Sequence, residues 1–247
     1  MRKTVKIVII IRMMENRQNL HNHTLFSDGN FSWERIVDQA ESSNLEIIGI
    51  SDHYFTTKVF HDVSLQGWLS NDLIRYLKLS AEGREKKRAG ATKILWGMEI
   101  DTCLERLGCS LFELPWNKLN SLDFILFEYI GEKDIGGMDL NPKTMEELRA
   151  NCRIPAIIAH PNIDKLDYYY GLENAFDIFG KFGFAIEIPA GCRNKWYWHR
   201  FDPKVLYKVN ISIGTDTHEV LSEVGNITKA LNFIQSNGLS DRLLKFT

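Results

Sequence analysis

Cysteine is scarce in this chain of 247 residues, and its four copies show none of the spacings of a metal finger. Cys103, Cys109, Cys152 and Cys192 form no CxxC pair, which argues against a zinc ribbon or a dithiol redox motif. We therefore expect free thiols in a reducing cytoplasm rather than a disulfide framework.

Long apolar runs and an excess of one charge are also absent. The apolar run Ile7–Ile11 ends at Arg12, which is too short for a signal peptide or a membrane span. We expect residues 1–14 to form an extra strand or an extension upstream of a start near Met14. Because 30 Lys and Arg nearly balance 32 Asp and Glu, the net charge is −2, and a nucleic acid is a less favoured partner. The sequence does not indicate an oligomeric state.

What the chain does have is an alternation of short apolar runs with longer segments of helical period. This alternation is typical of repeated β-α units around a parallel sheet or barrel. No linker, repeat or low-complexity segment interrupts it, so we expect one domain over residues 1–247. The seven expected strands are Asn19–His23, Glu46–Ser51, Lys93–Ile100, Asp123–Tyr129, Ala156–Ala159, Phe184–Ile188 and Ile211–Thr215.

Amphipathic segments between these runs predict helices. One begins after a capping Ser32, and the others are Asn71–Lys87, Pro142–Leu148, Leu172–Phe179 and Glu219–Gln235. The least regular stretches, Thr56–Gly67 and Cys103–Leu119, follow strands and are expected as loops at the mouth of a barrel.

Histidines gather at the carboxyl ends of the expected strands. Seven strand ends hold about 28 positions, and random placement of seven histidines would leave about one histidine among them. Five of the seven are there, namely His21, His23, His53, His160 and His218. A lone histidine at a strand end is more often structural, but this concentration predicts a functional site.

Carboxylates accompany these histidines at the same strand ends. Asp28, Glu99 and Asp216 bring the candidate ligands to eight, more than one ion can use. Imidazole and carboxylate without thiolate suit Zn, Mn or Fe, so we expect two or three divalent metal ions, with Glu99 as the bridge. A serine hydrolase is disfavoured because there is no GxSxG motif.

The ordered motifs resemble those of the PHP (polymerase and histidinol phosphatase) superfamily. They are Asn19-Leu-His-Asn-His-Thr, Ser27-Asp-Gly29, Ile50-Ser-Asp-His53, Gly97-Met-Glu99, Ile158-Ala-His-Pro161 and Gly214-Thr-Asp-Thr-His218. The resemblance covers residues 19 to about 235 and implies a distorted seven-stranded (β/α)7 TIM-like barrel. It also implies a dinuclear or trinuclear metal centre that hydrolyses phosphoesters.

The same resemblance assigns ligands residue by residue. The first site takes His21, His23, Glu99 and Asp216, the second adds His160 to Glu99, and the third takes Asp28, His53 and His218. One departure concerns the second site, where members carry a histidine just after the fourth strand. Simple counting puts Ile130 at that position, and Glu128 is the alternative ligand.

A segment after the sixth strand resembles the phosphate-binding segment of histidinol-phosphatase-type members. It contains Arg193, whose planar guanidinium suits two phosphate oxygens, and Lys195. Glu187 is a candidate for orienting a ligand, although Pro189 replaces the family's usual asparagine. Asp216 or His218 could protonate the leaving alcohol, as could water.

These residues predict a phosphatase that hydrolyses a small phosphomonoester, resembling histidinol phosphatases, by means of a metal-activated hydroxide. A nuclease or nucleotide phosphodiesterase is the first alternative. The net charge and the lack of a basic stripe beyond Arg84–Arg88 oppose it, while the aromatic clusters Tyr168–Tyr170 and Trp196–Trp198 favour it. A metal-binding regulatory protein without activity is the second alternative, because the ligand expected at Ile130 is missing.

Overall fold

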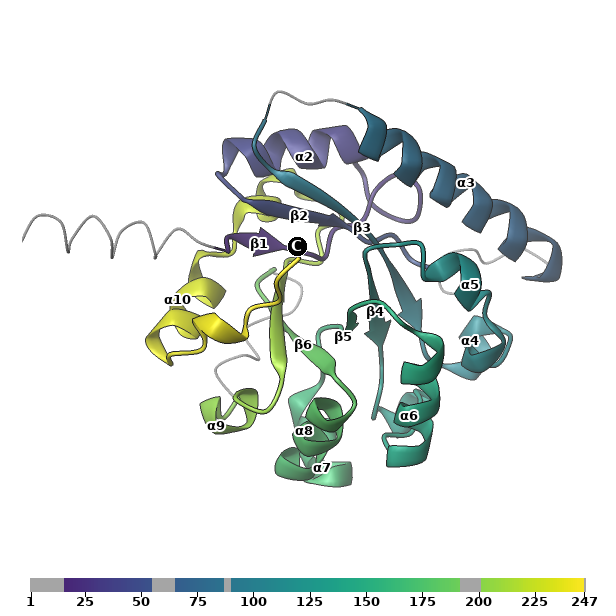
Figure 1. Cartoon of the computed structure of the whole chain (residues 1–247), viewed down its shortest axis with the longest axis vertical. Coiled ribbons are helices and arrows are strands. Elements are labelled where there is room, and N and C mark those ends of the chain that lie inside the picture. The colour runs from purple at the N-terminus through teal and green to yellow at the C-terminus, as the bar shows by residue number, and fades with distance from the viewer. Residues whose placement is uncertain (1–15, 55–64, 87–89, 192–200, 247) are drawn as a thin grey trace, which may run out of the picture.

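Parallel strands lie side by side in the order of the sequence and curve into a nearly closed barrel (Figure 1). The computed structural model describes residues 16–54, 65–86, 90–191 and 201–246, without the side chains of 65–71. Its seven strands are β1 (Gln18–Asn19), β2 (Ile47–Ile50), β3 (Lys93–Asp101), β4 (Phe124–Glu128), β5 (Ala156–Ile158), β6 (Phe184–Pro189) and β7 (Asn210–Gly214). The predicted (β/α)7 barrel is confirmed.

The first and last strands meet through their backbones. Leu20 N donates to Ile213 O at 2.8 Å, and His23 N donates to Thr217 O at 3.0 Å. Because β1 is only two residues long, these contacts lie beyond its end, on the segment that carries the first two histidines. The backbone hydrogen bonds that close the barrel therefore also position that segment.

Both faces of the strands are buried, which explains their continuous apolar runs. Every residue of β2, β4 and β5 is buried. Outward side chains such as Ile48, Ile125 and Ile158 pack in the main core, between sheet and helices. Inward side chains such as Leu20, Phe124 and Leu126 fill the barrel interior.

The helices surround the barrel, as Figure 1 shows. They are α2 (Trp33–Ser42), α3 (Leu65–Glu85), α4 (Leu104–Leu107), α5 (Trp116–Leu119), α6 (Pro142–Asn151), α7 (Ile163–Tyr170), α8 (Leu172–Lys181), α9 (Pro203–Leu206) and α10 (Thr228–Ser236). Short 3-10 turns are at Leu111–Glu113, Lys133–Ile135, Leu221–Gly225 and Ser240–Arg242. No helix of the described residues is long and apolar enough to cross a membrane.

Several sequence-based boundaries are wrong. The helix expected over Glu219–Gln235 is a 3-10 turn followed by α10, and the break falls at Asn226 and Ile227. The stretch Cys103–Leu119 is not an irregular loop, because it contains α4, a 3-10 turn and α5. Helices α7 and α9 were not expected, and each has only two buried residues, too few to set a clear apolar period.

The remaining expectations concern the start of α2 and two segments that lie wholly or largely outside the described residues. Ser32 occupies the N-cap position of α2, but its side chain makes no capping hydrogen bond. The expected loop at Thr56–Gly67 is described only from Leu65, where α3 has already begun. The strand or extension expected over residues 1–14 lies outside the described residues.

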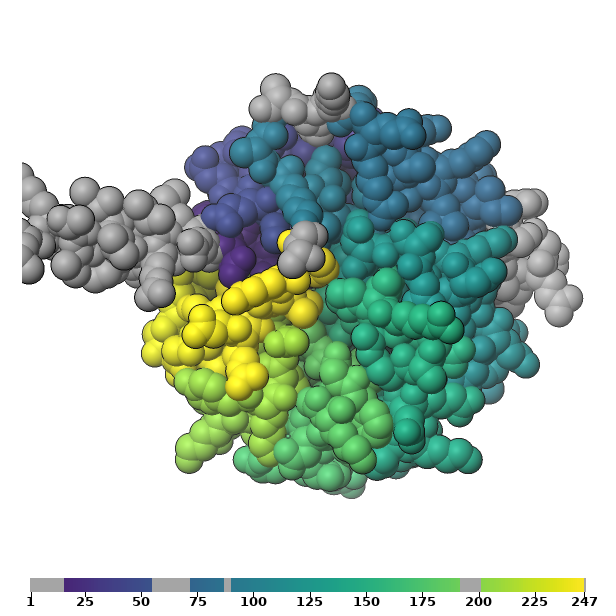
Figure 2. Space-filling view, viewed as in Figure 1, coloured from purple at the N-terminus to yellow at the C-terminus, as the bar shows by residue number. Residues whose placement is uncertain are grey.

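The C-terminal segment closes the barrel at the amino ends of the strands. Leu244 N donates to Ile211 O at 2.8 Å, and Gln18 Nε2 donates to Leu244 O at 3.1 Å. Leu244 and Phe246 pack against the barrel interior, and the rings of Phe246 and Phe124 are 6.3 Å apart. In Figure 2 the yellow C-terminal segment accordingly reaches the centre of this face.

We expect Phe246→Ala to lower the free energy of unfolding by about 2 kcal/mol, because a partly buried ring is lost from the base of the barrel. Chemical denaturation would measure the change. Lys245→Ala, which removes an exposed neighbouring side chain, is the matched control. Equal stability of the two variants would show that the segment does not seal the barrel.

Candidate metal centre

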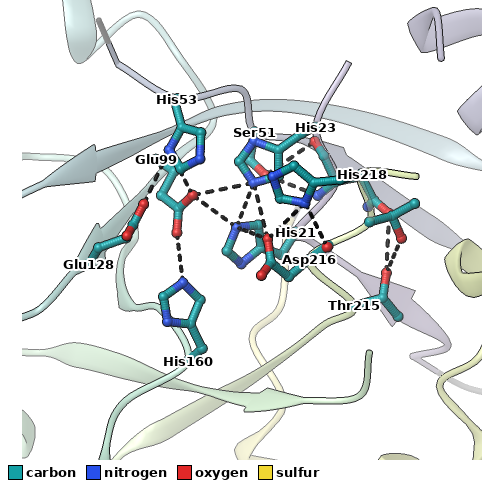
Figure 3. A network of polar contacts seen from close by, with 12 residues as sticks. His21, His23, Ser51, His53, Glu99, Glu128, His160, Thr215, Asp216 and His218 are labelled. Atoms are coloured by element: carbon teal, nitrogen blue, oxygen red, sulfur yellow. Dashed lines mark hydrogen bonds and ion pairs between the residues drawn. The ribbon is translucent and has the colours of Figure 1, made fainter. Parts of the chain in front are cut away.

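The carboxyl ends of the strands form one rim, and every metal ligand expected from the sequence lies there. Figure 3 labels all of them except Asp28. These residues come from the segments after β1, β2, β5 and β7, from β3, and from the end of β4. They are His21, His23, Asp28, His53, Glu99, Glu128, His160, Asp216 and His218. Strand ends far apart in the sequence converge because the strands are parallel and the barrel closes.

Glu99 lies at the centre of this rim and is completely buried. Its Oε2 is 3.2 Å from His21 Nε2, 3.3 Å from His23 Nε2 and 3.1 Å from His53 Nδ1. Its Oε1 is 3.1 Å from His160 Nε2. One carboxylate thus faces four imidazoles with two different oxygens, which is the geometry that a bridging ligand requires.

Four overlapping groups of side chains in the described residues could each hold a metal ion. The outer group is His23, Asp28, His53 and His218. The three inner groups are His21–Glu99–His160, His21–His23–Asp216 and His53–Glu99–Glu128. All donors are imidazole nitrogens or carboxylate oxygens, a set that suits zinc, manganese or iron.

Two imidazoles are oriented by an oxygen on the side away from the cluster. His21 Nδ1 lies 2.9 Å from Glu187 Oε1, and His218 Nδ1 lies 2.9 Å from the carbonyl oxygen of Asp216. Each ring therefore keeps its Nε2 for the interior of the site. Such an oxygen fixes the tautomer and the ring plane of a metal-binding histidine, so these contacts favour coordination through Nε2.

Positive φ angles mark three positions of the rim. They are 64° at Tyr129, 25° at His160 and 51° at Asp216, a region that side chains other than glycine rarely adopt. Glu187 Oε2 accepts a hydrogen bond from His160 N at 2.5 Å and so supports one of these turns. Strain of this kind persists where the surrounding structure holds it, commonly at functional sites.

Two buried polar atoms of the cluster have no hydrogen-bond partner among the described residues. They are Glu99 Oε2 and His23 Nδ1. Three imidazole nitrogens are close to Glu99 Oε2, but none approaches with acceptable hydrogen-bond geometry. An unpaired carboxylate oxygen in a buried site is costly, and divalent cations bound at separate ligand groups would satisfy these two atoms, so the residues fit metal binding.

Protonated imidazoles compensate the negative charge of the carboxylates when no metal ion is present. Burial opposes charge on His23, but its close contacts with the carboxylates of Asp216 and Glu99 outweigh it and raise its pKa to about 9. Burial likewise opposes charge on His160, and the contact with Glu99 raises its pKa to about 10. Burial opposes ionisation of Glu99 and Asp216, yet nearby imidazoles, His21 foremost, hold their pKa values well below the usual range.

The structure places Glu128 at the rim and Ile130 in the hydrophobic core. Glu128 ends β4 with its side chain fully buried, and its Oε1 lies 3.1 Å from His53 Nδ1. Ile130 is 2% exposed and belongs to the main hydrophobic core. The positive φ of Tyr129 redirects the chain between them, so counting along an extended strand misplaced the rim position.

Some expected residues lie outside the described residues. These are Arg193, Lys195 and the aromatic residues Trp196–Trp198.

One residue of the site was not predicted from the sequence, where only His53 of the motif Ser51-Asp52-His53 was a candidate. Asp52 is completely buried and accepts hydrogen bonds from Thr24 and Ser27. An acidic residue between a buried strand and a ligand histidine is the signal that could have found it.

Comparison with known proteins agrees with this geometry. The model of the PHP domain family matches residues 19–191, and the chain belongs to this family. Among solved structures, it is similar to the histidinol phosphate phosphatase HisK of Lactococcus lactis, a complex with zinc, L-histidinol and phosphate. The two share 18% identity with a TM-score of 0.52, over 94% of this chain and 97% of that one. A search of curated proteins finds no match.

We expect metal binding to release protons, because His23 and His160 have raised pKa values and bind a cation only as neutral imidazoles. The apparent affinity for Zn²⁺ or Mn²⁺ should therefore rise from pH 6 towards about pH 9. Calorimetric titration at pH 7.5 in buffers of different ionisation enthalpy would count the protons. No proton release would contradict the protonated state of the metal-free cluster.

We also expect Glu128→Gln to weaken metal binding by about ten-fold or more, because the inner group with His53 and Glu99 loses a charge. Titration against a chelating dye would measure the affinity. Glu132→Gln is the matched control, since Glu132 is also buried but pairs with Lys165 outside the cluster. Equal affinity of both variants would exclude Glu128 as a ligand.

Proposed function

We propose that the chain is a metal-dependent phosphatase that hydrolyses a small phosphomonoester, as a histidinol phosphatase does. The observation that carries the proposal is the convergence of four ligand groups on the rim of a barrel whose family is shown. Two or three divalent ions, of zinc, manganese or iron, match the number and the chemistry of the donors. The HisK complex with zinc, histidinol and phosphate supports both the metal and a substrate of this size.

Three sets of residues would each hold one metal ion. His21, His23, Glu99 and Asp216 would hold one ion, His160 and Glu128 would join Glu99 at a second, and Asp28, His53 and His218 would hold a third. Bound ions would activate a water molecule and neutralise the charge of the phosphate. Glu99 would keep adjacent positions at a constant separation, because its two oxygens face different imidazoles.

The remaining roles concern the substrate. Asp216 and His218 are candidates for protonating the leaving alcohol, and a hydrogen bond from His218 Nδ1 to the Asp216 carbonyl oxygen would keep both at one place on the rim. Arg193 would bind the phosphate through its guanidinium, with Lys195 beside it. We also propose that the chain acts in the cytoplasm as one domain over residues 1–247.

A small substrate agrees better with the charge of the protein than a nucleic acid does. The net charge is −2, and two described basic residues, Lys165 and Arg106, are paired with carboxylates. Lys165 contacts Glu132 at 2.8 Å and Asp134 at 3.0 Å, and Arg106 contacts Asp101 at 2.5 Å. These two side chains would therefore offer a phosphate backbone little unpaired positive charge.

We expect the protein supplied with Mn²⁺ or Zn²⁺ to hydrolyse an aryl phosphate, and to leave a bis-aryl phosphate and a short DNA oligomer intact. His23→Ala should lower the rate by more than about 100-fold, because His23 belongs to two ligand groups. Asn232→Ala, on the exposed face of α10, is the control.

Cleavage of the diester or of the oligomer would contradict the proposal and indicate a nuclease. Metal ions bound without hydrolysis of any of the three compounds would indicate a regulatory protein. Steady-state kinetics and metal analysis on the same preparation would separate these results.

A further inference from the structure

Asp52 is a buried carboxylate that belongs to none of the ligand groups and lies beneath the loop that carries Asp28. It directly precedes His53 and has no exposed surface. Its Oδ1 accepts hydrogen bonds from Thr24 N and from Ser27 Oγ, both at 2.7 Å, and its Oδ2 accepts one from Thr24 Oγ1 at 2.8 Å. All three donors come from the segment after β1.

The main chain of Asp52 is attached elsewhere. Its carbonyl oxygen accepts a hydrogen bond from Glu99 N at 3.0 Å, and His53 forms a parallel bridge with Glu99. Asp52 therefore joins the loop to the two strand ends that carry His53 and Glu99. A change at Asp52 would act on the loop through its side chain, while its backbone contact with β3 would stay in place.

Asp28 differs from the other members of the outer group. Its side chain is 39% exposed, whereas those of His23, His53 and His218 are at most 5% exposed. It reaches the group from a loop, with its Oδ1 3.1 Å from His218 Nε2 and 3.6 Å from His23 Nδ1. The geometry of the outer group therefore depends on the conformation of this loop more than that of the inner groups does.

Thr24 transmits the position of Asp52 to Asp28. Its carbonyl oxygen accepts hydrogen bonds from Ser27 N at 3.1 Å and from Gly29 N at 3.0 Å, which closes the turn that contains Asp28. The turn is tight, because a Cβ at Gly29 would lie 2.2 Å from the carbonyl oxygen of His23. The turn thus behaves as one unit, and Asp52 holds it at Thr24 and Ser27.

We propose that Asp52 is a positioning residue that sets the affinity of the outer group for a divalent cation by holding the Thr24–Gly29 turn and, through it, Asp28. The proposal rests on the metal centre of the proposed function. Outer contacts of this kind typically change metal affinity by about 10-fold to 100-fold when they are removed. Here the effect falls on one position of the centre, since the side-chain hydrogen bonds of Asp52 among the described residues all go to this turn.

The test compares Asp52→Ala with the wild type by calorimetric titration of the chelator-stripped protein with Zn²⁺ and with Mn²⁺. We expect one ion of the wild-type complement to bind about 10-fold to 100-fold more weakly, with the affinities of the others unchanged. Asp52→Asn should restore most of this affinity, because its amide oxygen still accepts from Thr24 N and Ser27 Oγ.

The matched control is Asp123→Ala at the opposite end of the barrel. Asp123 Oδ2 accepts a hydrogen bond from Trp96 N at 2.7 Å, so its loss also frees a backbone donor, but far from the rim. We expect this variant to be less stable and to keep the affinity for every ion. Weaker binding of one ion in both variants would reduce the effect of Asp52 to general destabilisation and overturn the proposal.

A double-mutant cycle with Asp28→Ala tests the route of the effect. If Asp52 acts through Asp28, adding Asp52→Ala to Asp28→Ala causes no further loss of affinity, and amide hydrogen exchange of residues 24–29 rises in Asp52→Ala alone and in the double variant. An undiminished loss in the Asp28→Ala background would overturn the proposal. Loss of every ion in Asp52→Ala, or a wild type without a third ion, would also overturn it. No substrate is used, so absence of hydrolysis leaves this test unaffected.

Discussion

The contact of one buried carboxylate with four imidazoles is the interaction on which the rim of this protein depends. Glu99 lies in β3 without access to solvent, and its charge is compensated by His21, His23, His53 and His160. An isolated buried carboxylate would be strongly destabilising, so the strand ends after β1, β2 and β5 must be held where their histidines reach it. The barrel provides that arrangement, and a cation would complete it.

The same region also closes the barrel. Asn19 Nδ2 donates to Asn22 Oδ1 at 3.1 Å and to Thr215 Oγ1 at 2.7 Å, and Asn22 Nδ2 donates to Gly49 O at 3.0 Å. These buried amides and the hydroxyl join β1 to its neighbours β2 and β7. Because buried polar groups that are fully paired favour one arrangement over others, the network fixes the register that places His21 and His23 inside the rim.

Much of the fold and of the site could be predicted from the sequence. The apolar runs predicted the seven strands, because strands buried on both faces show as continuous hydrophobic segments. The candidate ligands from His21 to His218 could be proposed because parallel strands bring their carboxyl ends to one edge. The positions of residues beyond a turn were harder to predict from the sequence. Ile130 and Glu128 are two residues apart, and the positive φ of Tyr129 between them leaves no mark in the sequence.

The sequence by itself determined the class of fold, the type of donor atoms and the strand ends that carry them, since these follow from local hydrophobicity and residue chemistry. Only the tertiary structure decided which side chains meet. It placed Glu128 in the site and Ile130 in the core, set the contacts of Glu99 with four imidazoles, and put Asp52 under the loop of Asp28. The physical reason is that hydrogen bonds and ion pairs act over about 3 Å, so they depend on how the barrel closes and where its loops turn.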